Sequence, residues 1–293
     1  MGIGEACSIG SALAWSVGVI MYKRLGETLA PLQLNLLKNL IVLAALLPTL
    51  LLMPGLGWPS MPAAAVAWTL LSGVLGIAIA DTLYFRALNE LGAARVGIIG
   101  NLYSPFVIVL SFAFLSERLN ALQGVGFVLV SAGVLLVSGQ RAGKQLAPEQ
   151  LRRGLLYGIA AIGLMAVAIV MVKRVLEGQP LLWVVALRLF GGAAGLAVLF
   201  VWRGQRLLPL AGTMPRFGWR SLFAAALLGQ YFSMMLWLAG YKYTKASVAA
   251  ILNESSSIFI VLLAWLFLHE GMNLRKLAGV TCTLSGVACM LLA

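Results

Sequence analysis

The chain has 293 residues, of which 61% are hydrophobic and only 10% are charged, and its mean hydropathy is +0.99. So much apolar surface excludes a water-soluble protein and predicts an all-α integral membrane protein. The net charge of +12 does not indicate a nucleic acid as partner, because the Lys and Arg residues lie almost wholly in short connections, where they contact lipid headgroups and set the topology.

Ten apolar runs are each near the length of about 20 residues that crosses a bilayer as a helix. The sequence places these ten transmembrane helices at residues 2–21, 32–53, 64–85, 94–115, 120–138, 155–174, 181–202, 218–240, 246–268 and 276–293. Cys7, Cys282 and Cys289 lie inside these runs without paired spacing. They indicate neither a disulfide framework nor a metal site, and no cofactor is expected.

The second half of the chain repeats the first. An offset of 153 residues aligns the following pairs without a gap: Gly76 with Gly229, Ser104 with Ser257, Phe106 with Phe259, Glu117 with Glu270, and Gly133 with Gly286. Nearer the start the offset is 150, and Lys38 then corresponds to Arg188. Each copy holds five spans, so the second copy must enter the membrane from the opposite side, which is the inverted-repeat plan of many secondary transporters. We therefore expect a first repeat at 1–138, a linker at 139–154 and a second repeat at 155–293, around a central cavity.

The basic residues indicate an orientation. The odd-numbered connections carry fourteen Lys and Arg residues and the even-numbered connections carry five. By the positive-inside rule this difference places both termini outside the cytoplasm.

The ninth run carries a carboxylate, Glu254, near its middle and next to Asn253. A charged side chain at the bilayer centre costs about 3 kcal/mol on insertion scales, so it is expected to face a protein-lined cavity. The corresponding residue of the first copy is Asn101, which is neutral. We expect Glu254 to bind either a proton or the substrate, with Asn101 as a hydrogen-bonding partner across the pseudo-twofold axis.

Small and polar residues gather on one side of the fourth and ninth runs, Ser104 and Ser257 among them. They line a cavity or allow close helix packing, and the pattern fits both. Pro105 is expected to break the fourth run and free the carbonyl of Asn101. The second copy has Ile258 at that position, so a kink is expected in the first copy alone.

The third and eighth runs combine an acid with aromatic residues, which suits a pocket for a cation or zwitterion. Alternatively Tyr84, Trp237 and Tyr241 belong to an interfacial aromatic belt, which is the favoured interpretation for Tyr241. The predicted substrate-binding or coupling residues are Glu254, Asn101, Asp81, Tyr84, Asn253, Ser257, Ser104, Trp237, Gln230, Ser233, Trp15 and Ser11, with Glu5, Lys38 and Arg188 as further candidates.

Other features of the sequence leave alternatives open. Lys38 and Arg188 either snorkel to the interface or bind an anionic group. Glu117 and Glu270 are expected to be structural helix caps rather than ligands, and His269 to be a surface residue. Glycines spaced seven residues apart on the fifth and tenth runs form a packing face within the protomer or a dimer contact, so both a monomer and a homodimer are possible.

Several short motifs resemble those of the EamA-type transporters of the drug/metabolite transporter superfamily. They are Trp15, Pro31 followed by Lys38, the run 81–87, and the turns 115–119 and 268–270. The resemblance implies that the third, fourth, eighth and ninth helices, with the first and sixth, surround a central cavity, while the fifth and tenth lie at the periphery. It also implies export of small metabolites, amino acids among them, driven by exchange or a proton gradient. Family members are drawn with cytoplasmic termini, contrary to the charge distribution.

The favoured function is a secondary transporter that exports a small amino-acid-like, zwitterionic or cationic metabolite by alternating access. Its partners are the substrate, the lipid bilayer of a bacterial inner membrane and protons as a coupling ion. A passive facilitator is the first alternative. An intramembrane enzyme is the second, with Asp81 and Glu254 as a carboxylate pair, but no Gly-x-Gly-Asp, Gly-x-Ser-Gly or His-Glu-x-x-His motif supports it.

Overall fold

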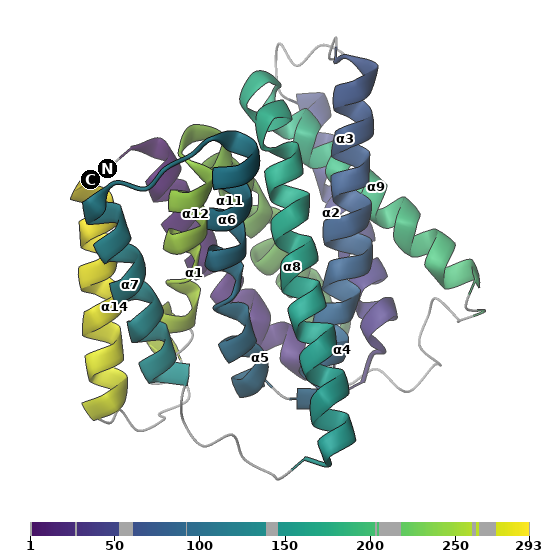
Figure 1. Cartoon of the computed structure of the whole chain (residues 1–293). Coiled ribbons are helices and arrows are strands. Elements are labelled where there is room, and N and C mark those ends of the chain that lie inside the picture. Colours follow the sequence, from purple (N-terminus) through teal and green to yellow (C-terminus); the bar gives the residue numbers. More distant parts are fainter. Residues whose placement is uncertain are drawn as a thin grey trace.

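The computed structural model describes residues 2–26, 28–52, 61–91, 93–138, 146–202, 204, 218–259, 262–263 and 274–292. The regular elements in these ranges are helices (Figure 1). Those of the first copy are α1 (Ile3–Leu25), α2 (Pro31–Leu52), α3 (Ala63–Gly73), η1 (Val74–Ala80), α4 (Asp81–Leu91), α5 (Ala93–Gly100), α6 (Tyr103–Leu115) and α7 (Ala121–Ser138). Those of the second are α8 (Pro148–Gly178), α9 (Leu181–Trp202), α10 (Gly218–Ala226), η2 (Leu227–Phe232), α11 (Ser233–Tyr243), α12 (Ala246–Asn253) and α14 (Leu274–Leu292).

The prediction of an all-α integral membrane protein is confirmed. Within the described ranges, 7 helices are long and apolar enough to cross a membrane, and Tyr103–Leu115 and Ala121–Leu136 are shorter apolar helices. α3, η1 and α4 form one continuous span, as do α10, η2 and α11. Each of the ten apolar runs therefore contains helix where the sequence predicted one.

α8 begins earlier than predicted, at Pro148 rather than at residue 155. Proline is favoured in the first turn of a helix, and the acidic Glu149 beside it is stabilised by the free amides there. Gln150 adds a hydrogen bond from its Nε2 to the carbonyl of Glu90 at 3.0 Å. Residues 148–154 of the predicted linker, seven of its sixteen, are thus the first turns of a helix.

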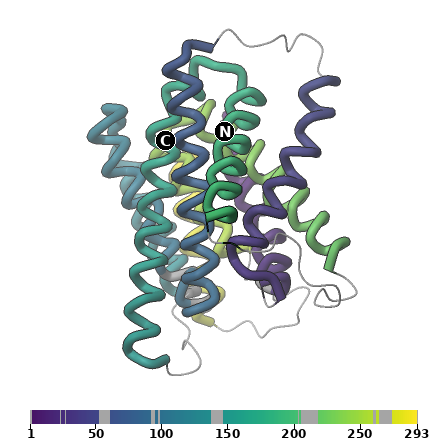
Figure 2. Tube along the Cα trace, turned by 90° about the vertical axis from the view of Figure 1, so that its right-hand side faces the viewer, coloured from purple at the N-terminus to yellow at the C-terminus, as the bar shows by residue number. Residues whose placement is uncertain are grey.

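The two copies are arranged in opposite directions. In Figure 1, α1 begins at the face that holds both termini, whereas α8 begins at the opposite face. Figure 2 shows the long helices lying side by side. Helices of different copies pack directly on one another, with α1 against α11 and η2, and α8 against α4 and η1. The core of the molecule is therefore the contact between the copies.

The same backbone irregularities occur in both copies. The third and eighth spans each contain a π-helical segment, η1 and η2, and residue 74 corresponds to residue 227. The fourth span is interrupted between Gly100 and Tyr103, and the ninth turns at Glu254 and Ser255. The prediction of a kink in the first copy alone is wrong, because the second copy breaks at the corresponding residues without a proline. There the amides of Glu254 and Ser255 bond three residues back, which tightens the last turn.

Glycines allow the spans of opposite copies to approach at these irregular segments. A Cβ on Gly18 of α1 would collide with the Cα of Gly229 in η2. At the corresponding crossing, a Cβ on Gly76 of η1 would lie 3.1 Å from the Cβ of Ala168 in α8. Small residues at helix crossings bring backbones close together in lipid. The π-helical segments η1 and η2 thus lie at the contact between the two copies.

The glycines of the fifth and tenth spans meet within the protomer. α7 and α14 pack together at one edge of the bundle (Figure 1). A Cβ on Gly133 would lie 2.6 Å from the carbonyl oxygen of Gly279 and would also collide with the side chain of Thr283. This contact accounts for the glycine pattern by packing alone.

Gly133→Leu is therefore expected to lower the free energy of unfolding by about 1–3 kcal/mol, the usual cost of overpacking a tight contact. Gly124→Leu on the same helix is the control, because nothing lies within 4 Å of a Cβ at Gly124. Unfolding in mixed micelles measures both variants. Equal effects of the two substitutions would contradict the packing role of Gly133.

Candidate functional site

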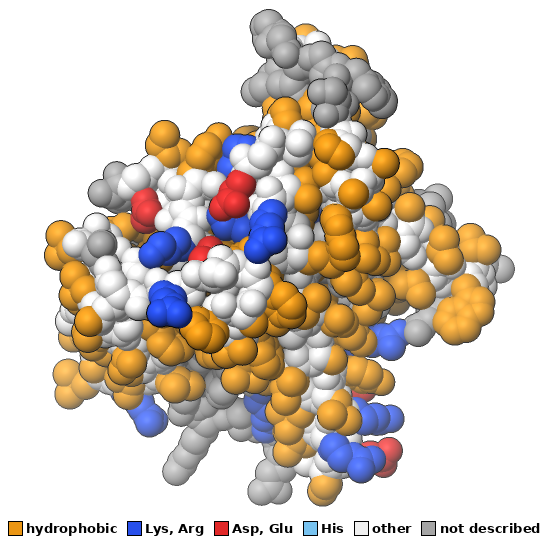
Figure 3. Space-filling view, turned by 45° about the horizontal axis from the view of Figure 1, so that its top comes forward, with side chains coloured by type: hydrophobic (Ala, Val, Ile, Leu, Met, Phe, Trp, Pro, Cys, Tyr) orange, Lys and Arg blue, Asp and Glu red, His pale blue; other side chains and the backbone are white. Residues whose placement is uncertain are grey.

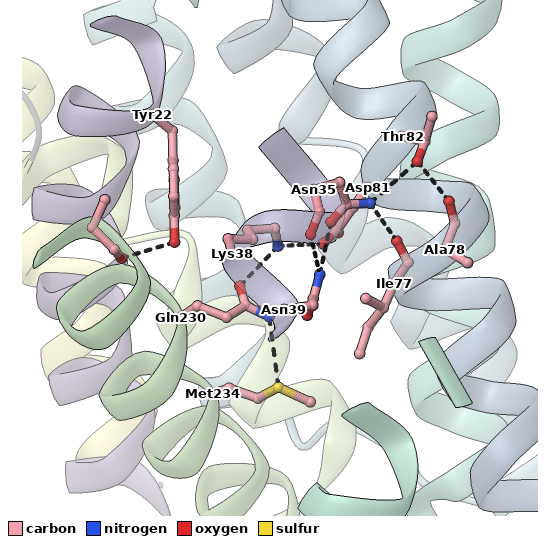
Figure 4. Close-up of polar contacts among 11 residues, drawn as sticks. Tyr22, Asn35, Lys38, Asn39, Ile77, Ala78, Asp81, Thr82, Gln230 and Met234 are labelled. Atoms are coloured by element: carbon pink, nitrogen blue, oxygen red, sulfur yellow. Dashed lines mark hydrogen bonds and ion pairs between the residues drawn. The ribbon is translucent and has the colours of Figure 1, made fainter. Parts of the chain in front are cut away.

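A buried ion pair joins the second and third spans. Lys38 Nζ lies 2.8 Å from Asp81 Oδ2 and donates a second hydrogen bond to Gln230 Oε1 at 3.1 Å (Figure 4). Its ammonium lies 5.9 Å from the ring centroid of Tyr22 and 5.6 Å from that of Phe85. Lys38 is 0% exposed, so it does not snorkel to the interface.

Asp81, which was predicted to bind a cation or zwitterion beside aromatic rings, forms an ion pair with Lys38 in the structure. The neighbouring Asn35 donates to the carbonyl of Ile77 at 2.8 Å and to Thr82 Oγ1 at 3.2 Å (Figure 4). Because these contacts reach the π-helical segment η1 and the start of α4, they hold Asp81 in position.

The corresponding cation of the second copy, Arg188 of α9, has a different environment. It is 3% exposed and donates from Nη1 to Ser72 Oγ at 2.5 Å. Its guanidinium carbon lies 5.3 Å from the ring centroid of Trp237. Among the described residues, no carboxylate lies within 4.0 Å of it, and its buried Nε has no hydrogen-bond partner.

Glu254 lies at the interruption of the ninth span. It is 7% exposed, and its Oε1 accepts a hydrogen bond of 3.3 Å from the amide of Ser104. Ser104 lies in the first turn of α6, where backbone amides have no partner within the helix and favour a negative group. The carboxylate therefore contacts the start of a helix of the first copy, and not Asn101 as predicted.

Three buried polar atoms around the two interruptions have no partner in the described part of the chain. They are Glu254 Oε2, Asn101 Nδ2 and Ser104 Oγ. Buried polar atoms are normally hydrogen-bonded, so each such exception requires an explanation. These atoms make the interruptions at residues 101–102 and 254–255 the candidate functional site.

A chain of side chains connects Arg188 to Glu254. Trp237, over which the guanidinium lies, packs edge-to-face on Tyr241 with ring centroids 5.1 Å apart. The hydroxyl groups of Tyr241 and Tyr103 are 2.8 Å apart, and Tyr103 precedes Ser104. Tyr241 is fully buried, so the interpretation as a residue of the aromatic belt is wrong.

Several other predicted site residues have structural contacts. Ser11 Oγ donates to the carbonyl of Ser233 at 3.0 Å, which joins α1 to α11. Glu5 accepts hydrogen bonds from its own helix start and from Thr244 Oγ1 at 2.8 Å. Asn253 Nδ2 donates to the carbonyl of Ala249 at 2.7 Å.

The remaining predicted residues are partly buried or already contact other side chains. Trp15 and Tyr84 pack on the rings of Tyr22 and Phe85, respectively. Ser257 is half-buried. Gln230 accepts from Lys38 and contacts the sulfur of Met234 at 3.7 Å.

Glu117 is a helix cap, as predicted, but for a helix of the other copy. Its carboxylate accepts hydrogen bonds from the amide of Ala246 at 2.8 Å, and from the amide and hydroxyl of Ser247 at 3.0 and 2.7 Å. These are the first residues of α12, so a turn of the first copy satisfies the free amides of the second. Glu270 and His269 lie outside the described residues.

A charged pocket surrounds this contact. Figure 3 shows basic and acidic side chains gathered in a hollow of a largely apolar surface, and the acidic residues that line the pocket are Glu117 and Glu177. The pocket has a volume of about 540 Å³ and is lined by Leu115, Glu117, Lys173, Arg174, Glu177, Lys242, Tyr243, Thr244 and Lys245. Arg174 donates to the carbonyl of Phe114 at 2.8 Å, and Lys245 donates to that of Arg118 at 3.3 Å. Cations of the second copy thus join it to the first at this face.

Glu117→Gln is expected to lower the free energy of unfolding by about 1–3 kcal/mol, the cost of leaving buried donors without a partner. The amide keeps one acceptor oxygen but presents its NH₂ group to the amides of α12. Glu177→Gln is the control because this carboxylate is 52% exposed and its pair with Lys173 is an i,i+4 contact. Unfolding in mixed micelles checks this, and an equal, small effect of both variants would argue against the cap.

Asn35, Ser72 and Tyr103 were not predicted from the sequence. Asn35 and Asn39 flank Lys38 at helical spacing in an otherwise apolar run, and this polar face could have been recognised. Ser72 and Tyr103 carry no comparable signal, because isolated hydroxyl groups are common in membrane helices. In the described residues, no group of three or more His, Cys, Asp or Glu side chains could hold a metal ion.

Two inverted copies of five spans around a buried polar centre define the protein as a membrane transporter of the inverted-repeat class. The chain belongs to the EamA-like transporter family, whose sequence model matches residues 2–139 and 152–292. It is also similar to Protein PecM of Dickeya dadantii (strain 3937), with 28% identity over 234 residues that cover 78% of this chain and 72% of PecM.

A solved crystal structure has the same fold. Its TM-score is 0.81 at 20% identity, and the match covers 99% of this chain and 96% of that chain. The chain is therefore an integral membrane transporter, and its bacterial relative indicates the inner membrane.

Proposed function

We propose that the protein is a secondary transporter that exports a small amino-acid-like, zwitterionic or cationic metabolite by alternating access, with proton or substrate exchange. The observation that carries this proposal is Glu254, a buried carboxylate with one unpartnered oxygen at the interrupted ninth span. Sites at the midplane between inverted repeats, formed by discontinuous helices, are the usual arrangement in such transporters.

The mechanism follows from the position of Glu254 between the copies. Its carboxylate belongs to the second copy and its hydrogen-bond donor, the amide of Ser104, to the first. Burial disfavours the charged form of a carboxylate, so Glu254 is stabilised by taking up either a proton or a cationic group of the substrate. Rocking of the copies against each other changes this contact and exposes the site to the other side.

The contacts around Glu117 fit a state of the transport cycle in which the face that holds the termini is closed. At the face that holds the termini, Glu117, Lys245 and Arg174 join the two copies by hydrogen bonds. Opening of that face requires these bonds to break. The conformation described therefore corresponds to one in which this face is held together.

The test begins with ligand binding. Purified protein is screened for a rise in melting temperature with amino acids, polyamines, nucleosides and quaternary ammonium compounds, because a ligand that binds only the folded state stabilises it. Compounds that bind are then tested in proteoliposomes for counterflow and for accumulation driven by a pH gradient. Absence of counterflow for every binding compound would overturn the proposal.

A passive facilitator is the second candidate, and it differs only in coupling. Accumulation of the substrate against its own gradient would exclude it. An intramembrane enzyme with a carboxylate pair has less support, since Asp81 is held by Lys38.

A further inference from the structure

The charged pocket at the face that holds the termini has an excess of positive charge. Four Lys and Arg side chains line it against two carboxylates, an excess of two. All four cations belong to the second copy, where α8 and α11 end and α12 begins. The first copy supplies only Leu115 and Glu117, which form the opposite wall. The pocket therefore lies at the contact between the copies.

Both carboxylates of the pocket already have partners. Glu117 accepts the amides at the start of α12. Glu177 pairs with Lys173, and its side chain is 52% exposed, which weakens the interaction. In the described ranges, no carboxylate lies within 4.0 Å of the other three cations of the pocket, which are Arg174, Lys242 and Lys245.

Backbone carbonyls accept some of the N–H donors of these cations but do not neutralise their charge. Lys242 donates to two carbonyls at the end of α8, a helix-capping contact that accounts for this residue structurally. Arg174 and Lys245 each donate to one carbonyl of the first copy. Both are exposed, and each carries several further donors. Packing therefore explains one of the three cations fully and the other two only in part.

The size, charge and position of the pocket fit a phosphate group. Its volume of about 540 Å³ is within the range of about 300–1,000 Å³ that small-molecule sites occupy. Phosphate carries up to two negative charges and binds both Lys and Arg. The pocket opens at the ends of membrane spans and is surrounded by apolar surface (Figure 3), and basic pockets between such spans bind lipid headgroups.

We propose that this pocket binds a phosphate group, carried by an anionic lipid headgroup or by a soluble phosphate compound. Arg174 and Lys245 are its main ligands, and Lys173 and Lys242 contribute positive charge from deeper in the pocket. The site is separate from the interruptions that hold Glu254, and the inference does not depend on which substrate is transported.

The test measures the melting temperature of the purified full-length protein across concentration series of three probes. Inorganic phosphate, at an ionic strength held constant with sodium chloride, represents the soluble source. Dioctanoyl-phosphatidylglycerol represents the lipid, and dioctanoylglycerol, which lacks the phosphate, is its control. A saturable rise is expected with at least one of the two phosphate probes, because a ligand that binds the folded state stabilises it.

The double substitution Arg174→Gln with Lys245→Gln is expected to weaken binding of that probe about tenfold or more, because it removes two charges from the pocket. The double substitution Arg152→Gln with Arg153→Gln is the control. It removes the same charge from exposed positions at the other end of α8 and is expected to change the affinity less than about twofold. Phosphate also stabilises proteins by exclusion from their surface, but that effect is common to all variants.

Glu177→Gln is expected to act in the opposite direction. It removes a carboxylate that competes for Lys173, so the phosphate probe should bind about threefold more tightly. This variant also serves if the double substitution at Arg174 and Lys245 does not fold. Unchanged or weaker binding in Glu177→Gln would contradict the site.

The two phosphate probes distinguish the source. A response to the lipid alone supports a headgroup site, and a response to inorganic phosphate supports a site that soluble compounds also reach. Three results would overturn the inference: no saturable response to either probe, an equal response to dioctanoylglycerol, or equal weakening by the two double substitutions.

Discussion

Glu254→Gln is expected to abolish coupled transport while leaving the fold intact. The amide has the same shape and can still accept the hydrogen bond from Ser104, but it cannot ionise or pair with an ammonium group. Loss of one partner of a buried, hydrogen-bonded charge pair costs about 2–5 kcal/mol. Substrate affinity is therefore expected to fall at least roughly 30-fold.

The measurement is uptake into proteoliposomes with and without a pH gradient, beside counterflow at equal pH on both sides. Glu177→Gln is the matched control, because it removes a carboxylate that is 52% exposed. The melting temperature of Glu254→Gln without ligand is expected to equal or exceed that of the unsubstituted protein, since a neutral amide is cheaper to bury. Full transport driven by the pH gradient in Glu254→Gln would rule out its role in proton coupling.

The span positions and the repeat could be predicted because they depend only on the hydropathy of the sequence and on its similarity to itself. An apolar run long enough to cross a bilayer forms a helix in lipid whatever its neighbours are, since its backbone has no other hydrogen-bond partners. The offset of 153 residues needed only a comparison of the sequence with itself. Neither required knowledge of which helix faces which.

The partners of the charged residues could not be predicted, because they depend on how helices are rotated and how deeply they lie. Lys38 and Asp81 are 43 residues apart and in different spans, and nothing in either run indicates that they meet. Glu117 was correctly expected to cap a helix from its position in a turn. Its target, α12, belongs to the other copy and became evident only from the packing.

The break in the ninth span illustrates a different limit. Proline is a reliable signal for an interrupted helix, and it predicted the interruption of the first copy. The second copy is also interrupted at Glu254, with Ile258 in place of the proline. Local propensity alone therefore underestimated how symmetrical the backbone is.

The backbone is symmetrical, but the charges are not. In the first copy the cation Lys38 is neutralised within the copy, and Asn101 is neutral. In the second copy Arg188 and Glu254 are both buried, and neither has an ionic partner among the described residues. Buried charges of both signs without an ion pair inside 4.0 Å in the described ranges thus belong to the second copy.

If Lys38 and Asp81 are a structural pair, single substitutions should be costly and the double substitution should not. Asp81→Asn leaves a fully buried ammonium without a counter-ion and is expected to cost about 3–5 kcal/mol. Lys38→Met leaves Asp81, whose side chain is 16% exposed and can be hydrated, so about 1–3 kcal/mol is expected. The double variant is expected to recover most of the loss, because a buried ion pair is often no more stable than a neutral replacement.

Unfolding of the four proteins in mixed micelles gives the coupling energy of the pair as a double-mutant cycle. Losses that simply add in the double variant would show that the two residues do not depend on each other.

Transport by the double variant distinguishes a structural role of the pair from a role of Asp81 in binding the substrate. If the pair only holds η1 and α4 in position, the stable double variant keeps the substrate preference of the unsubstituted protein. If Asp81 binds the substrate, that variant is stable but inactive, and the site must be extended from Glu254 toward the third span.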